Sequence, residues 1–77
     1  MVCEEICLIV NRAIKAMEYG KMEYLGTLLK DGVVLCMDLK GCTDICKAVK
    51  YALDEFKEGD YRECKKHLYK ARDMCKN

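Results

Sequence analysis

The residues of this sequence best suited to chemistry are its cysteines. There are seven in 77 residues, a density typical of disulfide-rich chains. Cys3 and Cys7 form a Cys-x3-Cys pair, and Cys42 and Cys46 repeat it. On a helix this spacing puts both sulfur atoms on one face. Such pairs are open to three kinds of chemistry: disulfide bonding, metal or iron–sulfur binding, and thiol catalysis.

The cysteines belong to an internal repeat, in which the sequence from position 42 onward matches the sequence from position 3 onward. Eight of 38 aligned pairs are identical, which indicates two copies of one structural unit. We call two residues that this register pairs repeat counterparts. Cys64 has Leu25 as its counterpart, and we interpret it as a small buried hydrophobic side chain. The identical pairs are Cys3/Cys42, Ile6/Ile45, Cys7/Cys46, Val10/Val49, Ala13/Ala52, Gly20/Gly59, Leu29/Leu68 and Cys36/Cys75.

Each copy reads as a helix, a bend at a glycine and a second helix. Apolar residues recur at three- and four-residue steps, and Gly20 and Gly59 follow the first helix of each copy. Residues 33–39 could form a strand on local sequence, but the repeat overlays them on the end of a helix. We therefore predict an all-α single domain, 1–77, of two tandem hairpins, 1–39 and 40–77. The predicted helices are 2–19, 21–38, 43–58 and 60–76.

The cysteine positions relative to the bends predict a disulfide at the open end of each hairpin. Cys3 lies almost as far before Gly20 as Cys36 lies after it, so the two stand at the same height. Cys42 and Cys75 have the same relation to Gly59. The predicted disulfides are therefore Cys3–Cys36 and Cys42–Cys75. Cys7 and Cys46 have three alternatives: a third disulfide with each other, competition for Cys36 and Cys75, or buried thiols.

A metal or cluster site is the functional alternative for the same residues. Each hairpin offers three cysteines, whereas a structural zinc site needs four ligands. His67, the single histidine, is expected near a bend and too far away to complete the set. It also has no paired nucleophile, and the sequence has no phosphate-binding glycine loop. We therefore expect no metal, no cofactor and no enzymatic activity.

Composition and the lack of targeting segments predict where in the cell this protein is found. The sequence has no secretory signal and no transmembrane stretch, which predicts a cytoplasmic protein without membrane contact. It has two Asn, no Gln and 35% charged residues, a balance typical of thermophiles. Proteins of hyperthermophiles keep disulfides inside the cell, which fits the number of cysteines.

Residues 48–77 resemble a tetratricopeptide hairpin. The resemblance depends on small and large positions at that family's spacing, with Cys64 where alanine is usual and no terminal proline. It implies a scaffold that binds peptides or proteins. The residues that carry it are Ala48, Tyr51, Ala52, Phe56, Gly59, Asp60, Tyr61, Cys64, Leu68 and Ala71.

The last predicted helix is basic, which favours a contact with nucleic acid or with an acidic partner. Its basic side chains are Arg62, Lys65, Lys66, Lys70, Arg72 and Lys76, against two acidic ones. The alternative is a solvated face with cations near a helix C-terminus, which is the commoner arrangement. The net charge of the whole chain is only +1, which does not by itself indicate a nucleic-acid partner.

Departures from the repeat predict an interface on hairpin one. The first copy has Leu8, Val33 and Val34, where the second copy has Lys47, Arg72 and Asp73. Exposed apolar side chains on a small protein usually mark an interface. The sequence therefore predicts a small non-enzymatic interaction module, a homodimer or the partner of another protein. A nucleic-acid binder and a metal–thiolate protein are its alternatives.

Overall fold

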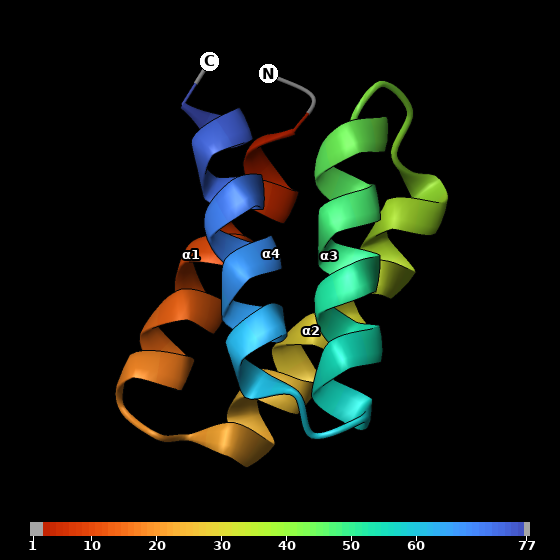
Figure 1. Cartoon of the computed structure of the whole chain (residues 1–77). Coiled ribbons are helices and arrows are strands. Elements are labelled where there is room, and N and C mark those ends of the chain that lie inside the picture. The colour runs from red at the N-terminus through yellow and green to blue at the C-terminus, as the bar shows by residue number, and fades with distance from the viewer. Residues whose placement is uncertain (1–2, 77) are drawn as a thin grey trace.

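The computed structural model describes residues 3–76 and contains four α-helices (Figure 1). This confirms the predicted all-α fold, and it shows that residues 33–38 are helical. The predicted start of the first helix at residue 2 lies outside the described residues. The helices are α1, Glu4–Glu18; α2, Met22–Asp38; α3, Thr43–Lys57; and α4, Tyr61–Cys75.

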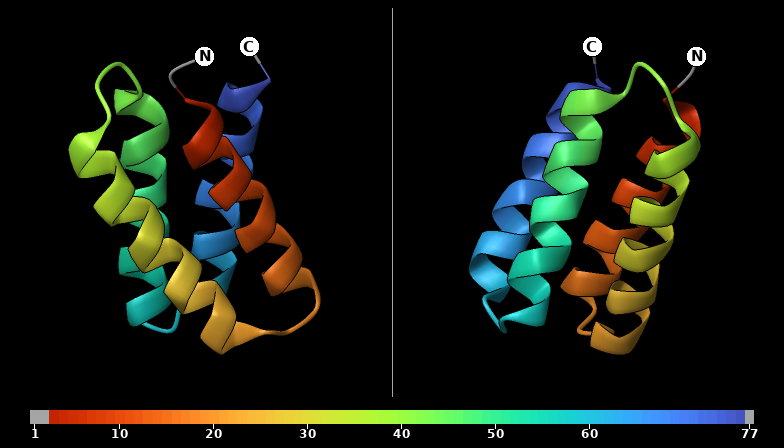
Figure 2. Two further views of the ribbon diagram at one scale, coloured as in Figure 1. Left: turned by 180° about the vertical axis from the view of Figure 1, so that it is seen from behind. Right: turned by 90° about the vertical axis from the view of Figure 1, so that its right-hand side faces the viewer.

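The four helices form two layers, each of which is one hairpin (Figure 2, right). We call α1 with α2 hairpin one, and α3 with α4 hairpin two. Both bends lie at one end of the molecule, which we call the bend end (Figure 1). The α2–α3 connection and both ends of the described chain lie at the other, the open end. Across the layers α1 packs on α4 and α2 packs on α3, and we call these two contact lines the α1–α4 seam and the α2–α3 seam.

Glycine makes both bends possible. Gly20 and Gly59 have φ of 71° and 80°, which side chains with a Cβ rarely adopt. In each bend the second residue after the helix cap donates its N–H back into the last turn. Lys21 donates to the carbonyl of Ala16 at 2.8 Å, and Asp60 donates to that of Glu55 at 2.9 Å. Both helices therefore end in the Schellman arrangement, and the chain reverses at once.

The core lies between the two layers and draws on all four helices. Its most enclosed side chains are Ile6, Val10, Leu25, Leu29, Val49, Cys64 and Leu68. Gly32 of α2 lets the layers approach closely, because a Cβ there would stand 3.1 Å from a methyl carbon of Val49. The two glycines of α2 lower its intrinsic helix propensity, but Gly32 gives room for packing in exchange.

The bounds of the helices follow the register of the sequence repeat. The first residues of α1 and α3, Glu4 and Thr43, are repeat counterparts, and so are the last residues of these two helices. α2 and α4 likewise begin at counterparts, Met22 and Tyr61. Identical positions of the repeat take the same place in the core, since the Ile6/Ile45 and Val10/Val49 pairs are all buried. Repeat counterparts can therefore be compared directly between the two hairpins.

Candidate functional site

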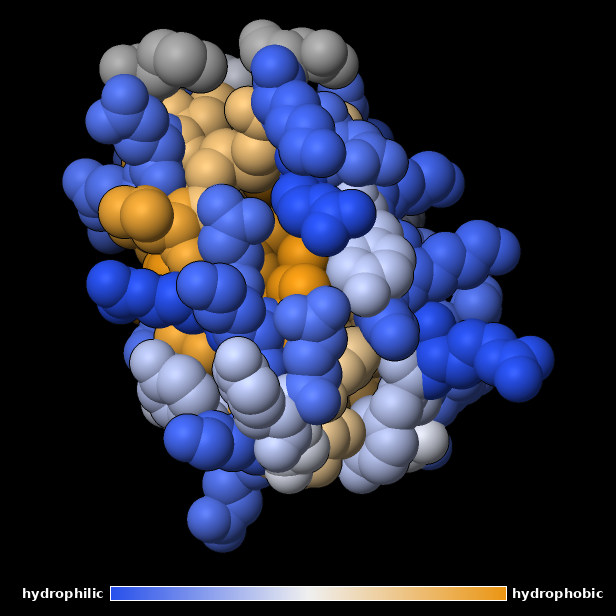
Figure 3. All heavy atoms as spheres, turned by 90° about the vertical axis from the view of Figure 1, so that its left-hand side faces the viewer, coloured by the Kyte–Doolittle hydropathy of each residue, from blue (hydrophilic) through white to orange (hydrophobic). Residues whose placement is uncertain are grey.

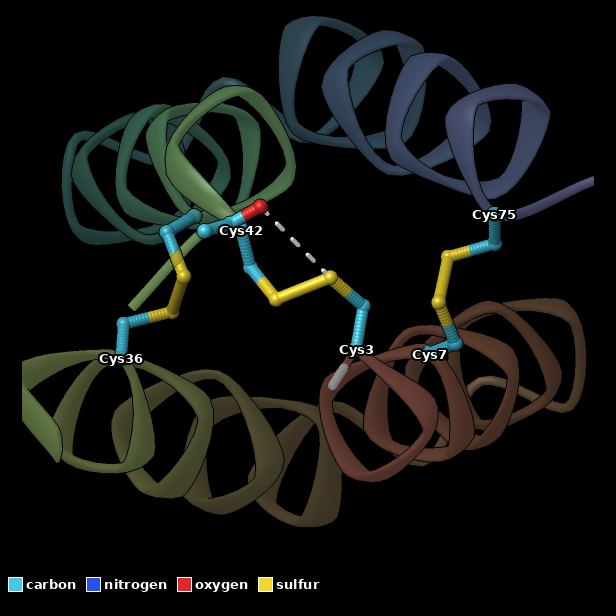
Figure 4. The surroundings of a disulfide bond; sticks show 7 residues. Cys3, Cys7, Cys36, Cys42 and Cys75 are labelled. Carbon is cyan, nitrogen blue, oxygen red and sulfur yellow. Dashed lines mark hydrogen bonds between the residues drawn. A yellow bond between two sulfur atoms is a disulfide. The ribbon is translucent and has the colours of Figure 1, made fainter. Parts of the chain in front are cut away.

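Three disulfides lie together at the open end (Figure 4). Each joins hairpin one to hairpin two, with Cα atoms 5.8 to 5.9 Å apart, which is the usual span. A dashed line in Figure 4 joins the Sγ of Cys3 to the carbonyl oxygen of Gly41, 4.0 Å away. Because a disulfide sulfur carries no hydrogen, this is a packing contact. The bonds are Cys3–Cys42, Cys7–Cys75 and Cys36–Cys46.

The predicted pairing is wrong, although all the predicted residues are in disulfides. Distance from the bends gives the height of a cysteine along its helix, and the predicted heights are right, since all six lie at the open end. Height says nothing about the face of the helix, and these cysteines lie on faces that meet the other hairpin. The predicted pairs Cys3–Cys36 and Cys42–Cys75 are therefore wrong. Of the three alternatives for Cys7 and Cys46, a bond with each other and buried thiols are also wrong. The two residues take Cys75 and Cys36, each from the other hairpin.

Cys64 is the one free cysteine among the described residues, and it is fully buried in the core. Burial raises the pKa of its thiol from 9.0 to about 11, and the nearby charge of Glu55 adds to the effect. The thiol is therefore uncharged at neutral pH and a poor nucleophile. This confirms its interpretation as a buried hydrophobic side chain.

The metal–thiolate alternative has no ligand set in the part of the chain that the structure describes. Six cysteines are bonded to one another and have no thiolate to offer. Among residues 3–76 no three His, Cys, Asp or Glu side chains are placed to share a metal ion. His67 lies instead beside Tyr51 of α3, with ring centroids 5.5 Å apart.

The α2–α3 seam contains a pocket of about 400 Å³. Its apolar lining comes mainly from the last two turns of α2, next to the Cys36–Cys46 disulfide. Met37 is the most exposed large hydrophobic side chain described, at 80% of its surface. The opposite wall is α3, and its charged lining side chains are both lysines. The lining residues are Val33, Cys36, Met37, Leu39, Thr43, Cys46, Lys47 and Lys50. We call this pocket the α2–α3 groove.

At the equivalent positions on the α1–α4 side, larger side chains pack on one another. Arg72 lies one turn before Cys75, which is bonded to Cys7 of α1, so Arg72 faces α1. Its guanidinium stands 4.6 Å from the ring centre of Tyr69, a cation–π contact, and its Nε is buried. The repeat counterparts of these two residues are Val33 and Lys30. Figure 3 shows the α1–α4 side, where hydrophobic side chains lie between hydrophilic ones.

The structure places Val33 on a different surface from the other two predicted interface residues. Leu8 of α1 and Val34 of α2 are exposed, at 56% and 61% of their surfaces. Val33 is half-buried and lines the α2–α3 groove, whose lining includes neither of the other two. Sequence reasoning missed Met37, although the same comparison could have found it, because its repeat counterpart is Lys76.

The basic side chains of α4 and of its C-cap, Lys76, lie on the half of the helix away from its buried residues, with Arg72 at the edge of that half. All except the half-buried Arg72 are exposed. Lys65 and Arg72 both lie over the ring of Tyr69, on the α1 side. Lys70 lines a different pocket, of about 240 Å³, together with Lys47 and His67 on the α3 side. The remaining predicted contacts, Arg62, Lys66 and Lys76, are exposed.

Comparison of the chain with protein-family models, with curated proteins and with solved structures finds no match. The likeness of residues 48–77 to a tetratricopeptide hairpin therefore stays a resemblance.

Among residues 3–76, none of the helices combines the length and the apolar character that crossing a membrane requires.

Proposed function

We propose that this protein is a small non-enzymatic interaction module that self-associates through hairpin one. The observation that carries the proposal is the exposure of Leu8 and Val34, with more than half of each side chain open to solvent. The equivalent positions of hairpin two hold Lys47 and Asp73. At these two positions the hairpins thus differ in surface character, and the apolar pair on hairpin one is suited to be buried against another chain.

The experiment is light scattering on Val34→Lys. A charge in the centre of an apolar contact is desolvated without a partner, so we expect the assembly to dissociate and the mass to fall to that of one chain. Asp73→Lys is the matched control, because it makes the same residue at the equivalent exposed position of hairpin two. Identical mass and stability for wild type and Val34→Lys would refute self-association through this surface.

A second candidate function is binding of single-stranded nucleic acid by hairpin two. The observation in its favour is that Tyr51 and His67 lie beside Lys47 and Lys70 in one pocket, an arrangement of aromatic rings and cations. Binding of a fluorescent oligonucleotide should then weaken steeply as salt rises. Lys70→Glu should reduce it, with Lys57→Glu as the control. An absence of binding at low salt would remove this candidate.

A further inference from the structure

The α2–α3 groove is a second surface of this molecule, separate from Leu8 and Val34. Its floor and one wall are apolar, from Val33, Leu39 and the Cys36–Cys46 disulfide. Met37 stands at the edge with most of its side chain exposed. Methionine is flexible and polarisable, so it can adapt to the shape of an apolar group placed against it. The disulfide joins the two walls covalently, which holds the groove at a fixed width.

The charges of the groove have one sign. Lys47 and Lys50 of α3 line it, and none of its lining residues is acidic. Both lysines are exposed, so their ammonium groups stand at the rim. An apolar floor with a cationic rim favours a ligand that has an apolar side chain flanked by carboxylates.

Comparison with the other seam shows what the groove lacks. On the α1–α4 side the chain supplies an aromatic ring and a cation of its own, Tyr69 and Arg72, packed on each other. In the α2–α3 seam the equivalent residues are Lys30 and Val33, which are smaller or more polar. The groove, of about 400 Å³, has room for a side chain from a partner.

A second copy of the same groove is a poor occupant. Two such grooves facing each other would bring Lys47 and Lys50 of both copies together, and like charges at an interface oppose association. We propose that the α2–α3 groove binds an acidic peptide segment of a partner protein, with an apolar side chain against Val33, Met37 and Leu39. Its carboxylates lie beside Lys47 and Lys50. The proposal rests on the proposed function, that the protein is an interaction module.

Methyl NMR on protein labelled at its methionines tests this proposal. The probe is a short amphipathic helical peptide of leucine and glutamate, and its matched control has lysine in place of every glutamate. We expect the glutamate peptide to shift the methyl signal of Met37, while Met22 at the bend end and Met74 of α4 stay in place. The lysine peptide should bind at least tenfold more weakly, because it brings like charge to the rim.

Two pairs of variants locate the binding. Val33→Arg puts into the groove the residue found at position 72, and it should weaken binding at least tenfold. Val34→Arg, one position along α2 and outside the groove, should leave the affinity within about threefold. Lys47→Glu with Lys50→Glu should reverse the preference toward the lysine peptide, whereas Lys57→Glu, also on α3, should keep it. Because the lysines are exposed, these charge changes test the proposal even where Val33→Arg perturbs folding.

Three results would overturn the proposal. One is the absence of any Met37 shift with the glutamate peptide, and another is equal affinity for the two peptides. The third is a Met37 shift that follows protein concentration without any peptide, because this would assign the groove to a second copy. Self-association through Val34 is measured by mass and can hold when peptide binding fails, so the two failures are distinguishable.

Discussion

The α1–α4 and α2–α3 seams are built from repeat counterparts, and they differ in what fills them. Cys7–Cys75 joins the first and Cys36–Cys46 the second, so each bond has its counterpart in the other seam. On the first side Tyr69 and Arg72 pack on each other, while the second contains a pocket of about 400 Å³. The bounds of α1 and α3 are repeat counterparts, and α2 and α4 begin at counterparts. The two seams thus differ in a few side chains at equivalent positions of the repeat.

The largest change in stability that we expect comes from removing the disulfide of each seam in turn. Cys7→Ala with Cys75→Ala removes a bond with a sequence separation of 68, and Cys36→Ala with Cys46→Ala removes one with a separation of 10. By loop-closure entropy the free energy of unfolding should fall by about 4 kcal/mol in the first case and about 3 kcal/mol in the second. Denaturant unfolding measures both. A larger loss from the shorter loop would show that packing in the α2–α3 seam outweighs chain entropy.

The second prediction concerns the contribution of Tyr69 to stability on the α1–α4 side. Tyr69→Ala removes a half-buried ring together with its contact to Arg72, which should lower the free energy of unfolding by about 2 kcal/mol. Lys30→Ala, at the equivalent exposed position of α2, should change it by less than about 0.5 kcal/mol. Thermal unfolding of the two variants compares them directly. Equal effects would mean that Tyr69 does not stabilise the seam.

A third test uses Leu25 and Cys64, which are repeat counterparts and are both fully buried. The unfolded Cys64 thiol ionises near pH 9, but the folded thiol does so only near pH 11. The unfolded state therefore binds fewer protons over this interval, so stability should fall as pH rises, by up to about 1.4 kcal/mol per pH unit.

The variant Cys64→Ala should lack this contribution, so the difference in unfolding free energy between wild type and variant should change between pH 9 and 11. Leu25→Ala is the control: it is destabilising at every pH, with no change of slope relative to wild type over the same interval. Parallel curves for wild type and Cys64→Ala would refute the raised pKa.

The smallest expected effect comes from converting one seam into the other. Lys30→Tyr with Val33→Arg gives α2 the two residues that α4 has at these positions. A new cation–π contact should raise the free energy of unfolding by roughly 1 kcal/mol and fill the α2–α3 groove. Unfolding and binding of the glutamate peptide are measured on the same protein. A variant that is less stable than wild type would show that backbone spacing also differs between the seams.

The helices and bends could be predicted from sequence because their causes are local. Apolar residues at helical spacing indicate where each helix runs, and glycine at positions 20 and 59 marks the ends of α1 and α3. The pairing of cysteines depends on which helix faces which, and this is not local. The repeat could not decide it either. Both the predicted and the observed pairings are unchanged when every cysteine is exchanged for its repeat counterpart.

The candidate site could be predicted only in part. The apolar residues that replace charged ones in the first copy include Val33, which lines the α2–α3 groove in the structure. Leu39 and the two lysines of the groove could not be assigned from sequence, because they join Val33 only when α2 and α3 lie side by side. The volume of a cavity between two helices depends on how far the side chains of each reach toward the other. The pattern of apolar residues along one helix does not contain this information.

The disulfides at the open end also decide how the molecule carries mechanical load. A pulling force applied between residues 3 and 76 passes from Cys3 along one turn of α1, through the Cys7–Cys75 bond, and out at Lys76. The rest of the chain, with the core and both bends, lies outside this covalent path. Stretching the protein by its ends should therefore leave most of it slack until the bond is reduced. Reduction would change a short inextensible link into a long extensible one.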